Sequence, residues 1–410
     1  MSVIDDAKNI LSAYAKTIPQ YLNGTDRAIY LLENLENLKS EERIILKEAF
    51  NRFLISMIER EASDIEIGGH GNGGFIWMRV FGKKERAKEF PQFSVEEAAV
   101  LIINLLNSNQ RKILAEVRNL DFSYSFYYER KHADIRFRAD AYFDLDTLTL
   151  NMRAINPSIR PLNSYGFHQN VLRTLSHSYI KSGLTLVTGI TGSGKSTTLD
   201  AIIDEHNKTD PAHIVIISSP VEYVHKSNIA IVKHREVGRD VLSFHEGVIQ
   251  SLRQDPDIIV IGEMRDPATI MAALEVTDTG HKVFSTLHTS SAVESIDRII
   301  AEINPVEQER VRHRLADVLV AIISQKLVPS LDGKRVLAKE VLIVTPSVKA
   351  AIKNNNTSEI YMMINQGAPQ GMITMEQDLK RLYLNRQISI DNAIAYANNK
   401  TRIQQIISAV

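Results

Sequence analysis

The 410-residue sequence contains no cysteine, and this absence excludes a disulfide framework, thiol catalysis and any zinc site that needs thiolate ligands. An excess of charge of one sign is also absent. Lysine and arginine total 48, aspartate and glutamate total 49, and the net charge is -1. Overall charge therefore favours neither nucleic acid nor an anionic membrane surface as a partner, and we expect no direct binding to nucleic acid.

Long hydrophobic runs are missing as well. The longest apolar stretch of the N-terminal half, residues 98–106, is interrupted by Asn104, whereas a helix that spans a bilayer needs about 20 apolar residues. The first ten residues, MSVIDDAKNI, have neither the basic start nor the apolar core of a signal peptide. We expect a cytoplasmic protein, either free or docked on a partner.

The N-terminal part of the chain is patterned as an α+β domain. Residues 1–40 show weak periodicity and are interpreted as a helical extension, whereas residues 41–60 carry apolar side chains at helical spacing. Ser94 and Glu97 form a capping-box pattern that predicts the start of another helix. Alternating apolar residues predict strands near 64–67, 75–81, 122–128, 135–141 and 148–152. We therefore place an α+β domain at residues 41–154.

The C-terminal part has the pattern of an α/β domain. Residues 155–164 contain two prolines and few apolar side chains, and they are the predicted linker. Short apolar strands at 185–188, 213–217, 257–261 and 283–286 then alternate with longer helices, which predicts parallel strands with crossover helices. We place this domain at residues 165–410 and expect it to be mostly helical from about residue 330.

A complete phosphate-binding loop follows the first of these strands. The sequence GITGSGKS, residues 189–196, fits G-x-x-x-x-G-K-[ST] between an apolar strand and a helix, which is the context that the motif requires. The alternative, a glycine-rich turn with an idle lysine, does not explain this context. Lys195 would reach the β- and γ-phosphates of ATP, and the Ser196 hydroxyl would bind Mg²⁺. The residues expected to contact nucleotide are Gly189, Thr191, Gly192, Ser193, Gly194, Lys195, Ser196 and Thr197.

Two further groups could act on the phosphate. The strand within residues 255–266 ends in acidic residues, and we expect it to lie beside the phosphate loop, where Glu263 would orient and deprotonate an attacking water. The alternative is a buried strand that ends in a solvated glutamate. Asp266 and Pro267 are interpreted structurally, as the N-cap and first residue of a helix. His281 and His288 flank the strand at 283–286, and His288 either senses the γ-phosphate or is merely packed.

Three arginines lie on the polar phase of the predicted strands. Arg136, Arg138 and Arg153 could stabilise the transferring phosphoryl group in a neighbouring subunit, an effect worth roughly 10³–10⁵ in rate. The alternative is a solvated strand face. Residues 68–74 are rich in glycine, but no helix follows them, so we interpret them as a hairpin turn rather than a phosphate cradle.

Taken in order, these motifs resemble the secretion ATPases of the PilT type, the hexameric motors of type IV pili and related secretion systems. The resemblance is carried by ASDIEI (62–67), LVTGITGSGKSTTL (186–199), DPDIIVIGEMRD (255–266) and TGHKVFSTLHTSSAVESIDRII (279–300). It implies a PAS-like N-terminal domain followed by a RecA-like P-loop domain. It also implies that Glu263 is the Walker B glutamate, that His288 belongs to the His box, and that the three arginines reach nucleotide at subunit boundaries.

The sequence departs from the family at two places. The family's Asp box usually carries an acidic pair before its proline, but here Ser218 and Ser219 precede Pro220, so Glu222 is left as the carboxylate expected near Mg²⁺. The helix at 347–354 has Lys349 and Lys353 where retraction motors carry arginines, and lysine lacks the planar fork of arginine. The absence of cysteine favours the PilT-like branch, because extension and type II secretion motors usually carry a four-cysteine zinc module.

The resemblance implies an ATP-hydrolysing homo-hexameric motor that powers type IV pilus retraction and twitching motility. It would act on an inner-membrane platform protein at the inner face of the cytoplasmic membrane, with membrane contact only through partners. One alternative is a DotB-like motor of a type IV secretion or conjugation system. A second is a nucleotide-gated scaffold that does not hydrolyse ATP.

Overall fold

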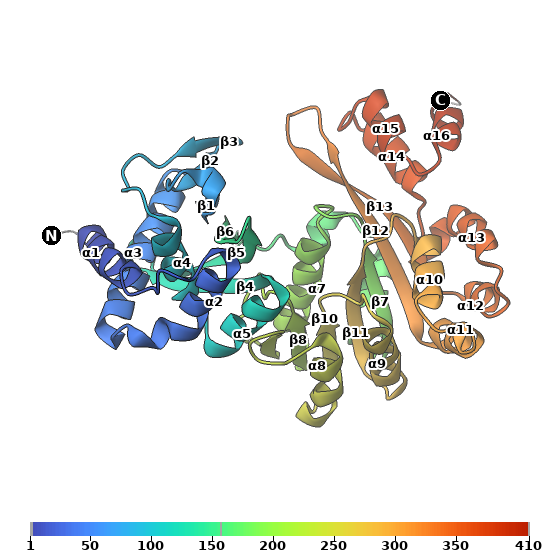
Figure 1. Cartoon of the computed structure of the whole chain (residues 1–410). Helices are drawn as coiled ribbons and strands as arrows, with labels where there is room; N and C mark the ends of the chain where they lie inside the picture. The colour runs from blue at the N-terminus through green and yellow to red at the C-terminus, as the bar shows by residue number, and fades with distance from the viewer. Residues whose placement is uncertain (1–2, 156–157, 409–410) are drawn as a thin grey trace. The chain divides into compact units, whose positions relative to one another are not determined.

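The computed structural model describes residues 3–155 and 158–408, which form two compact units (Figure 1). The first unit covers the chain up to residue 155 together with Ser219–Val224 and Gly238–Asp240, and the second covers the other described residues. The expected linker at 155–164 includes residues 156 and 157, which lie outside the described residues. None of the described helices is both long enough and apolar enough to cross a bilayer.

The first unit is a six-stranded antiparallel sheet with helices packed against it. Its strands lie in the order β3-β2-β1-β6-β5-β4. Its helices are α1 (Val3–Ala15), α2 (Gly24–Asn34), α3 (Ser40–Glu59), α4 (Val95–Ile103) and α5 (Ser108–Val117). Its strands are β1 (Ala62–Gly68), β2 (Trp77–Val80), β3 (Lys83–Arg86), β4 (Asn119–Tyr128), β5 (Ala133–Asp144) and β6 (Thr147–Ala154).

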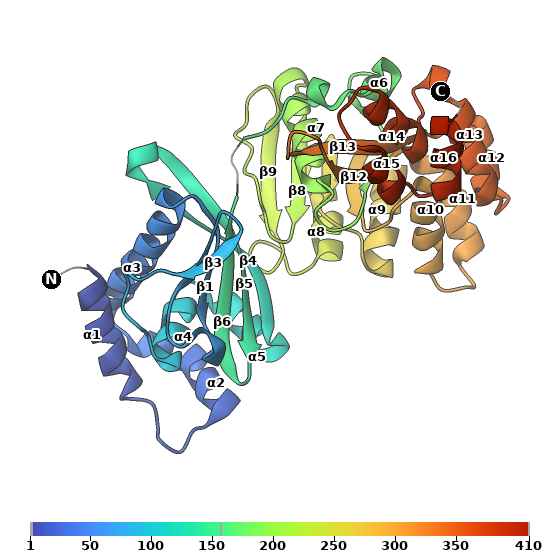
Figure 2. The ribbon, with the colours of Figure 1, turned by 90° about the horizontal axis from the view of Figure 1, so that it is seen from above.

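Alternation along these strands produces one apolar and one polar face. Phe137 and Ala139 of β5 are fully buried, whereas Arg138 between them is exposed, as a period of two requires. Helices α3 and α4 pack on β1 and β6 and close the core on the apolar side (Figure 2). The predicted capping box of Ser94 and Glu97 is present at the start of α4.

The described residues of the N-terminal extension, 3–40, belong to this same core. Leu11 of α1 and Leu31 of α2 are almost completely buried and pack in one cluster with Phe50 and Phe53 of α3. The helical extension expected from the sequence is therefore an integral layer of the first unit.

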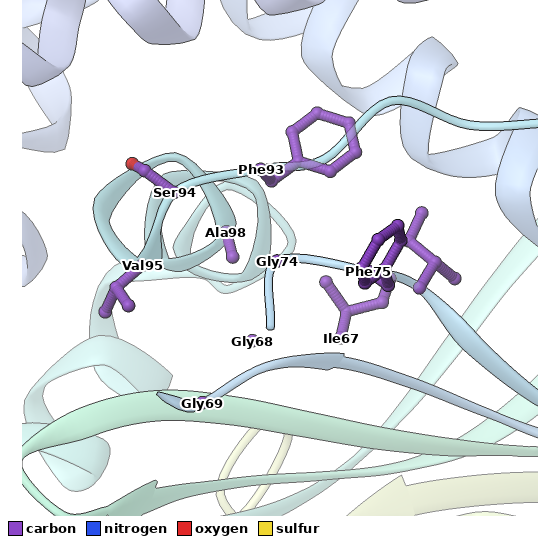
Figure 3. Close-up of a pocket in the computed structure, with 10 residues that line it drawn as sticks. Ile67, Gly68, Gly69, Gly74, Phe75, Phe93, Ser94, Val95 and Ala98 are labelled. Carbon is purple, nitrogen blue, oxygen red and sulfur yellow. The ribbon is translucent and has the colours of Figure 1, made fainter. Parts of the chain in front are cut away.

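The glycine-rich connection after β1 is a tight packing feature and not an anion cradle. Gly68 and Gly74 approach α4 and enclose a cavity of about 20 Å³, roughly the space of one water molecule. Figure 3 shows that its lining is mainly apolar, with Ile67, Phe75 and Phe93 around it. A Cβ atom on Gly68 would lie 2.3 Å from the Leu148 carbonyl oxygen, so the close approach requires glycine there.

The second unit is built on a seven-stranded sheet in the order β13-β12-β7-β11-β10-β8-β9, in which only β13 runs antiparallel to its neighbour. The strands are β7 (Gly183–Thr188), β8 (His213–Ser218), β9 (Ile231–Glu236), β10 (Ile258–Ile261), β11 (Lys282–Leu287), β12 (Leu319–Pro329) and β13 (Arg335–Ile343). The helices are α6 (Gln169–Leu175), α7 (Lys195–Thr209), α8 (Phe244–Ser251), α9 (Pro267–Asp278), α10 (Ala292–Ala301), α11 (Gln308–Val318), α12 (Pro346–Lys353), α13 (Ile360–Gln366), α14 (Met375–Leu384), α15 (Ile390–Tyr396) and α16 (Lys400–Ser408).

Helices cover both faces of this sheet, and successive residues of each central strand therefore belong to different cores. In β8, Ile214 and Ile216 pack with α6 and α7, whereas Val215 and Ile217 pack with α8 and α9. Strands buried on both faces are expected to be continuously apolar, as these are. The predicted mixed α/β fold, with four parallel strands separated by helices, is confirmed.

The prediction that the chain is mostly helical from about residue 330 is wrong for residues 335–343, which form β13. This strand pairs with β12 through the turn at Ser330–Lys334. Asp332-Gly333 between two apolar runs is a hairpin signal that predicts this turn. Strand β9 was also not predicted, because only three of its six residues, Ile231, Val232 and His234, are apolar or aromatic.

If α1 is part of the core, Leu11→Ala should destabilise the first unit by about 2–5 kcal/mol, the cost of a core cavity. Trp77, the single tryptophan of the chain, lies in β2, so its fluorescence during denaturant unfolding reports this unit selectively. Asn9→Ala, at an exposed position of the same helix, is the control. Equal stability of the two variants would contradict the placement of α1 in the core.

Candidate active site

The order of the strands determines which residues meet at the carboxyl edge of the second sheet. Strand β11 lies between β7 and β10, so the residue after β11 is placed between the residues that follow the other two strands. These residues are His288 after β11, the phosphate loop after β7, and Glu263 after β10. The strand that precedes Glu263 is thus separated from the phosphate-loop strand by β11, and His288 occupies the intervening position. Glu263 is still close enough to the phosphate loop for its charge to act on Lys195.

The phosphate loop has the backbone that its glycines predict. Gly189, Gly192 and Gly194 all have positive φ angles, and Lys195 begins the 15-residue helix α7. A Cβ atom on Gly189 would lie 2.3 Å from Ser193 Oγ and 2.6 Å from the Gln325 carbonyl oxygen. At Gly192 nothing lies within 4 Å of such an atom, so glycine is needed there for its φ of 78° and not for space.

Lys195 turns its ammonium group back into the loop. Its side chain is mostly buried, and Nζ donates to the carbonyl oxygens of Gly189 at 2.8 Å and Ile190 at 3.2 Å. Burial lowers the pKa of Lys195 from its ordinary value, and the negative charge of Glu263 opposes this shift. Backbone carbonyls offset only part of the cost of burying a charge, so an anion that reached this ammonium would be strongly favoured.

His288 connects the lysine to the glutamate. Its Nδ1 lies 3.5 Å from Lys195 Nζ, and its Nε2 lies 3.0 Å from Glu263 Oε1. An ammonium can only donate and a carboxylate can only accept, so a neutral imidazole protonated at Nε2 satisfies both neighbours. Burial, with the adjacent Lys195 charge, lowers the pKa of His288, which agrees with this neutral form.

Two arginines that the sequence analysis did not single out complete the surroundings. Arg265 Nε lies 2.5 Å from Glu263 Oε1, and Arg298 Nη1 of α10 donates to the His288 carbonyl oxygen at 3.0 Å. Arg265 could have been noticed two residues beyond Glu263. No local sequence pattern identifies Arg298 as a site residue, because its contact with the His288 carbonyl depends on how α10 packs. Asp266 is the N-cap of α9 and Pro267 its first residue, as predicted.

The loop has features that fit a bound nucleotide phosphate. Ser193 Oγ is buried and has no hydrogen-bond partner among the described residues, as expected of a donor that awaits an acceptor. Ser196 and Thr197 are exposed in the first turn of α7, and Thr191 and Gly192 are exposed in the loop. Polar groups at a helix N-terminus, together with a buried lysine, are the chemistry that binds phosphate.

The remaining candidates lie in the first unit. Arg136 Nη2 donates to the Val221 carbonyl oxygen at 2.8 Å, and Arg138 Nη1 lies 3.6 Å from Glu222 Oε1. Arg153 lies directly opposite Arg138 in the sheet, and its Nε donates to Asp64 Oδ1 at 2.8 Å. The three arginines therefore lie on the polar phase of β5 and β6, as predicted, and share one face of the sheet. Their action on nucleotide stays a prediction.

Magnesium binding also stays a prediction. Of its two expected ligands, Ser196 belongs to the second unit and Glu222 to the first. Residues 3–155 and 158–408 contain no cluster of three or more histidine, aspartate or glutamate side chains arranged to hold a metal.

Comparison with known proteins identifies the family. Residues 39–406 match the Type II/IV secretion system protein family. The chain belongs to this family. It is 38% identical over 316 residues to the "Type IV pilus retractation ATPase PilT" of Pseudomonas aeruginosa, which covers 77% of this chain and 89% of that relative. The predicted resemblance to secretion ATPases of the PilT type is confirmed.

Solved structures agree with this assignment. The pilus retraction motor PilT with bound ADP superposes with a TM-score of 0.75 at 35% identity, over 86% of this chain and 98% of that chain. The ATPase DotB of Legionella pneumophila superposes with a TM-score of 0.74 at 27% identity, over 88% of this chain and 95% of that chain.

Lys195→Ala should abolish measurable nucleotide binding, because the substitution removes the buried cation that offsets phosphate charge. The expected loss is about 3 kcal/mol or more, a weakening of Kd by roughly 100-fold or more. Lys208→Ala, on the exposed side of the same helix, should bind like the parent chain. Calorimetric titration with ADP and with a non-hydrolysable ATP analogue measures both. Near-parental affinity of Lys195→Ala would overturn the phosphate-loop assignment.

Proposed function

We propose that the protein is an ATP-hydrolysing motor that assembles as a ring of six copies and powers retraction of a type IV pilus, and thereby twitching motility. The observation that carries the proposal is the line from Lys195 through His288 to Glu263 at the end of three neighbouring strands. Family membership and the similarity to the retraction motor PilT support the same conclusion.

Each side chain of this line has a defined task in the proposal. Lys195 leaves the loop carbonyls to bind the β- and γ-phosphates, while the loop amides and Ser193 hold the phosphate oxygens. Glu263 accepts a proton from the attacking water. His288 donates from Nε2 to Glu263 and keeps the carboxylate oriented, and a change at the γ-phosphate reaches Glu263 through it. Ser196 and Glu222 would hold Mg²⁺, which would supply additional positive charge at the phosphates.

The arginines are proposed to act across subunit boundaries. They lie in the first unit on one face of two paired strands, with Arg136 and Arg138 on β5 and Arg153 on β6. An arginine supplied in trans couples hydrolysis in one copy to the position of its neighbour. A motor needs such coupling, because bond cleavage must change the arrangement of the copies.

We further propose that the ring acts on an inner-membrane platform protein at the inner face of the cytoplasmic membrane and contacts the membrane only through such partners.

A DotB-like role in type IV secretion or conjugation is the second candidate, favoured by the similarity to DotB. Deletion of the gene in its own host separates the two. Loss of retraction with intact pili would support the function as a pilus retraction motor. Loss of substrate transfer would support the function in secretion or conjugation.

Hydrolysis itself is tested by Glu263→Gln. An amide does not accept the proton of the attacking water, so turnover should fall by about 10²–10⁴-fold while ATP binding is retained. Steady-state phosphate release across a magnesium titration is the measurement, and Glu275→Gln, at an exposed position of α9, is the control. Equal turnover of Glu263→Gln and the parent would refute the catalytic assignment. Absence of magnesium-dependent hydrolysis by the assembled parent would favour the nucleotide-gated scaffold.

Action in trans is tested by mixing subunits. Arg136→Ala and Arg138→Ala should each reduce turnover and leave ATP binding intact, whereas Arg130→Ala, on the exposed connection between β4 and β5, should not. Addition of Lys195→Ala subunits to an arginine-deficient ring should restore part of the activity, because mixed interfaces pair one intact site with one intact arginine face. Co-assembly without any rescue would show that the arginines do not act across the boundary.

A further inference from the structure

A buried carboxylate on β13 holds the N-terminal end of a helix in the second unit. Glu340 of β13 is 2% exposed, and its Oε1 accepts a hydrogen bond at 2.8 Å from the N–H of Ala292, the first residue of α10. The preceding residue of the same strand, Lys339, donates its backbone N–H to Asp378 Oδ2 of α14 at 2.9 Å. Strand β13 therefore makes hydrogen bonds both to α10, next to the candidate active site, and to α14 of the C-terminal helices.

Neither helix needs Glu340 as its cap. Ser291 caps α10 by accepting from the Glu294 N–H at 3.2 Å, and Thr374 caps α14 in a complete capping box with Gln377. Since each helix already has its own N-cap, the distinctive contribution of Glu340 is the connection of α10 to β13. Burial of a carboxylate is costly unless hydrogen-bond donors compensate it, and burial raises the pKa of Glu340 to about 7.

Helix α10 determines the position of His288 in two ways. It follows the His288 loop after only three residues, and its Arg298 donates to the His288 carbonyl oxygen at 3.0 Å. A second contact comes from the C-terminal segment, where Asn398 Nδ2 donates to the Ser290 carbonyl oxygen at 3.2 Å. The backbone on which His288 depends is thus held by α10 and by the C-terminal helices together.

We propose that Glu340 is a positioning residue for ATP hydrolysis, which fixes α10 against β13 and thereby places His288 between Lys195 and Glu263. The inference rests on the proposed function of His288. It also connects the C-terminal helices to the nucleotide site, because α14 is bound to the strand that carries Glu340.

Glu97 of α4, in the first unit, offers a matched control. It is 5% exposed, and its carboxylate accepts from the Ser94 N–H at 2.7 Å and from the Ser12 hydroxyl at 2.6 Å. Like Glu340, it is a buried carboxylate that accepts a backbone N–H at the start of a helix, but none of these contacts involves α10, β13 or the C-terminal helices. Glu97→Gln therefore makes the same chemical change and leaves the connection to α10 in place.

The test compares Glu340→Gln and Glu97→Gln in the full-length assembled protein. Glutamine replaces the charged acceptor by a neutral amide, which makes a weaker hydrogen bond to the Ala292 N–H. We expect Glu340→Gln to lower kcat about tenfold, which corresponds to roughly 1.4 kcal/mol on the barrier, with KM and analogue binding unchanged. Glu97→Gln should keep kcat within about twofold. An equal fall in both variants, or loss of nucleotide binding in Glu340→Gln, would overturn the proposal.

A double-mutant cycle with Arg298→Ala tests the route through α10. If Glu340 acts on His288 through this helix, the two substitutions should not be additive in kcat. Full additivity would contradict the route.

Hydrogen exchange separates failure of this inference from failure of the proposed function. Glu340→Gln should raise amide exchange at residues 289–295, whether or not the chain hydrolyses ATP. If the parent shows no hydrolysis but this change appears, the proposed function fails and the connection stands. If residues 289–295 exchange as in the parent, the connection is refuted even in an active motor.

Discussion

The candidate site depends on a buried ammonium group whose counter-charge arrives only with the ligand. Lys195 is largely removed from water, and two backbone carbonyls and the neutral ring of His288 surround it. A cation in such a place is costly unless acceptors converge on it. The glycine-rich loop provides them by curling its own carbonyls toward the side chain. The same loop leaves the buried Ser193 hydroxyl without a hydrogen-bond partner among the described residues, so the loop that accommodates the lysine also holds a donor for the phosphate.

Strand order converts this local feature into a site. Strands β7, β11 and β10 are neighbours in space but are separated along the chain by crossover helices. Because parallel strands end at the same edge, the residues after them meet. Lys195, His288 and Glu263 are therefore brought into one line although they lie tens of residues apart. Replacing the middle residue would disconnect the lysine from the glutamate and leave the sheet unchanged.

The difference between contiguous motifs and contacts that depend on strand order explains what could be predicted from the sequence. The phosphate loop was predicted correctly as a structure because its glycines, lysine and flanking strand and helix are contiguous. The N-cap at Asp266 and the capping box at Ser94 also involve only neighbouring residues in the sequence, and both were predicted correctly. The order of β7, β11 and β10 is not local, so the position of His288 between the lysine and the glutamate was not predicted. The packing of α1 in the core of the first unit was not predicted for the same reason, because Leu11 contacts its partners only through tertiary packing.

Two lysines of the second unit show why residue type alone does not define a site. Lys282, at the start of β11, donates to the carbonyl oxygens of Thr174, Ser176 and Ile180, and burial lowers its pKa to about 7. Three acceptors match the three donors of an ammonium, so this lysine is complete without a ligand and serves to tie the segment after α6 to the strand.

The two ends of β11 thereby have different tasks. At its amino end Lys282 anchors the strand, and six residues later His288 contacts Lys195, whose recorded acceptors are two carbonyls and a ring nitrogen at 3.5 Å. An imidazole that must hold its place between a cation and a carboxylate needs a rigid support. The buried lysine at the far end of the same strand provides that support, because a shift of β11 along its axis would break three hydrogen bonds at once.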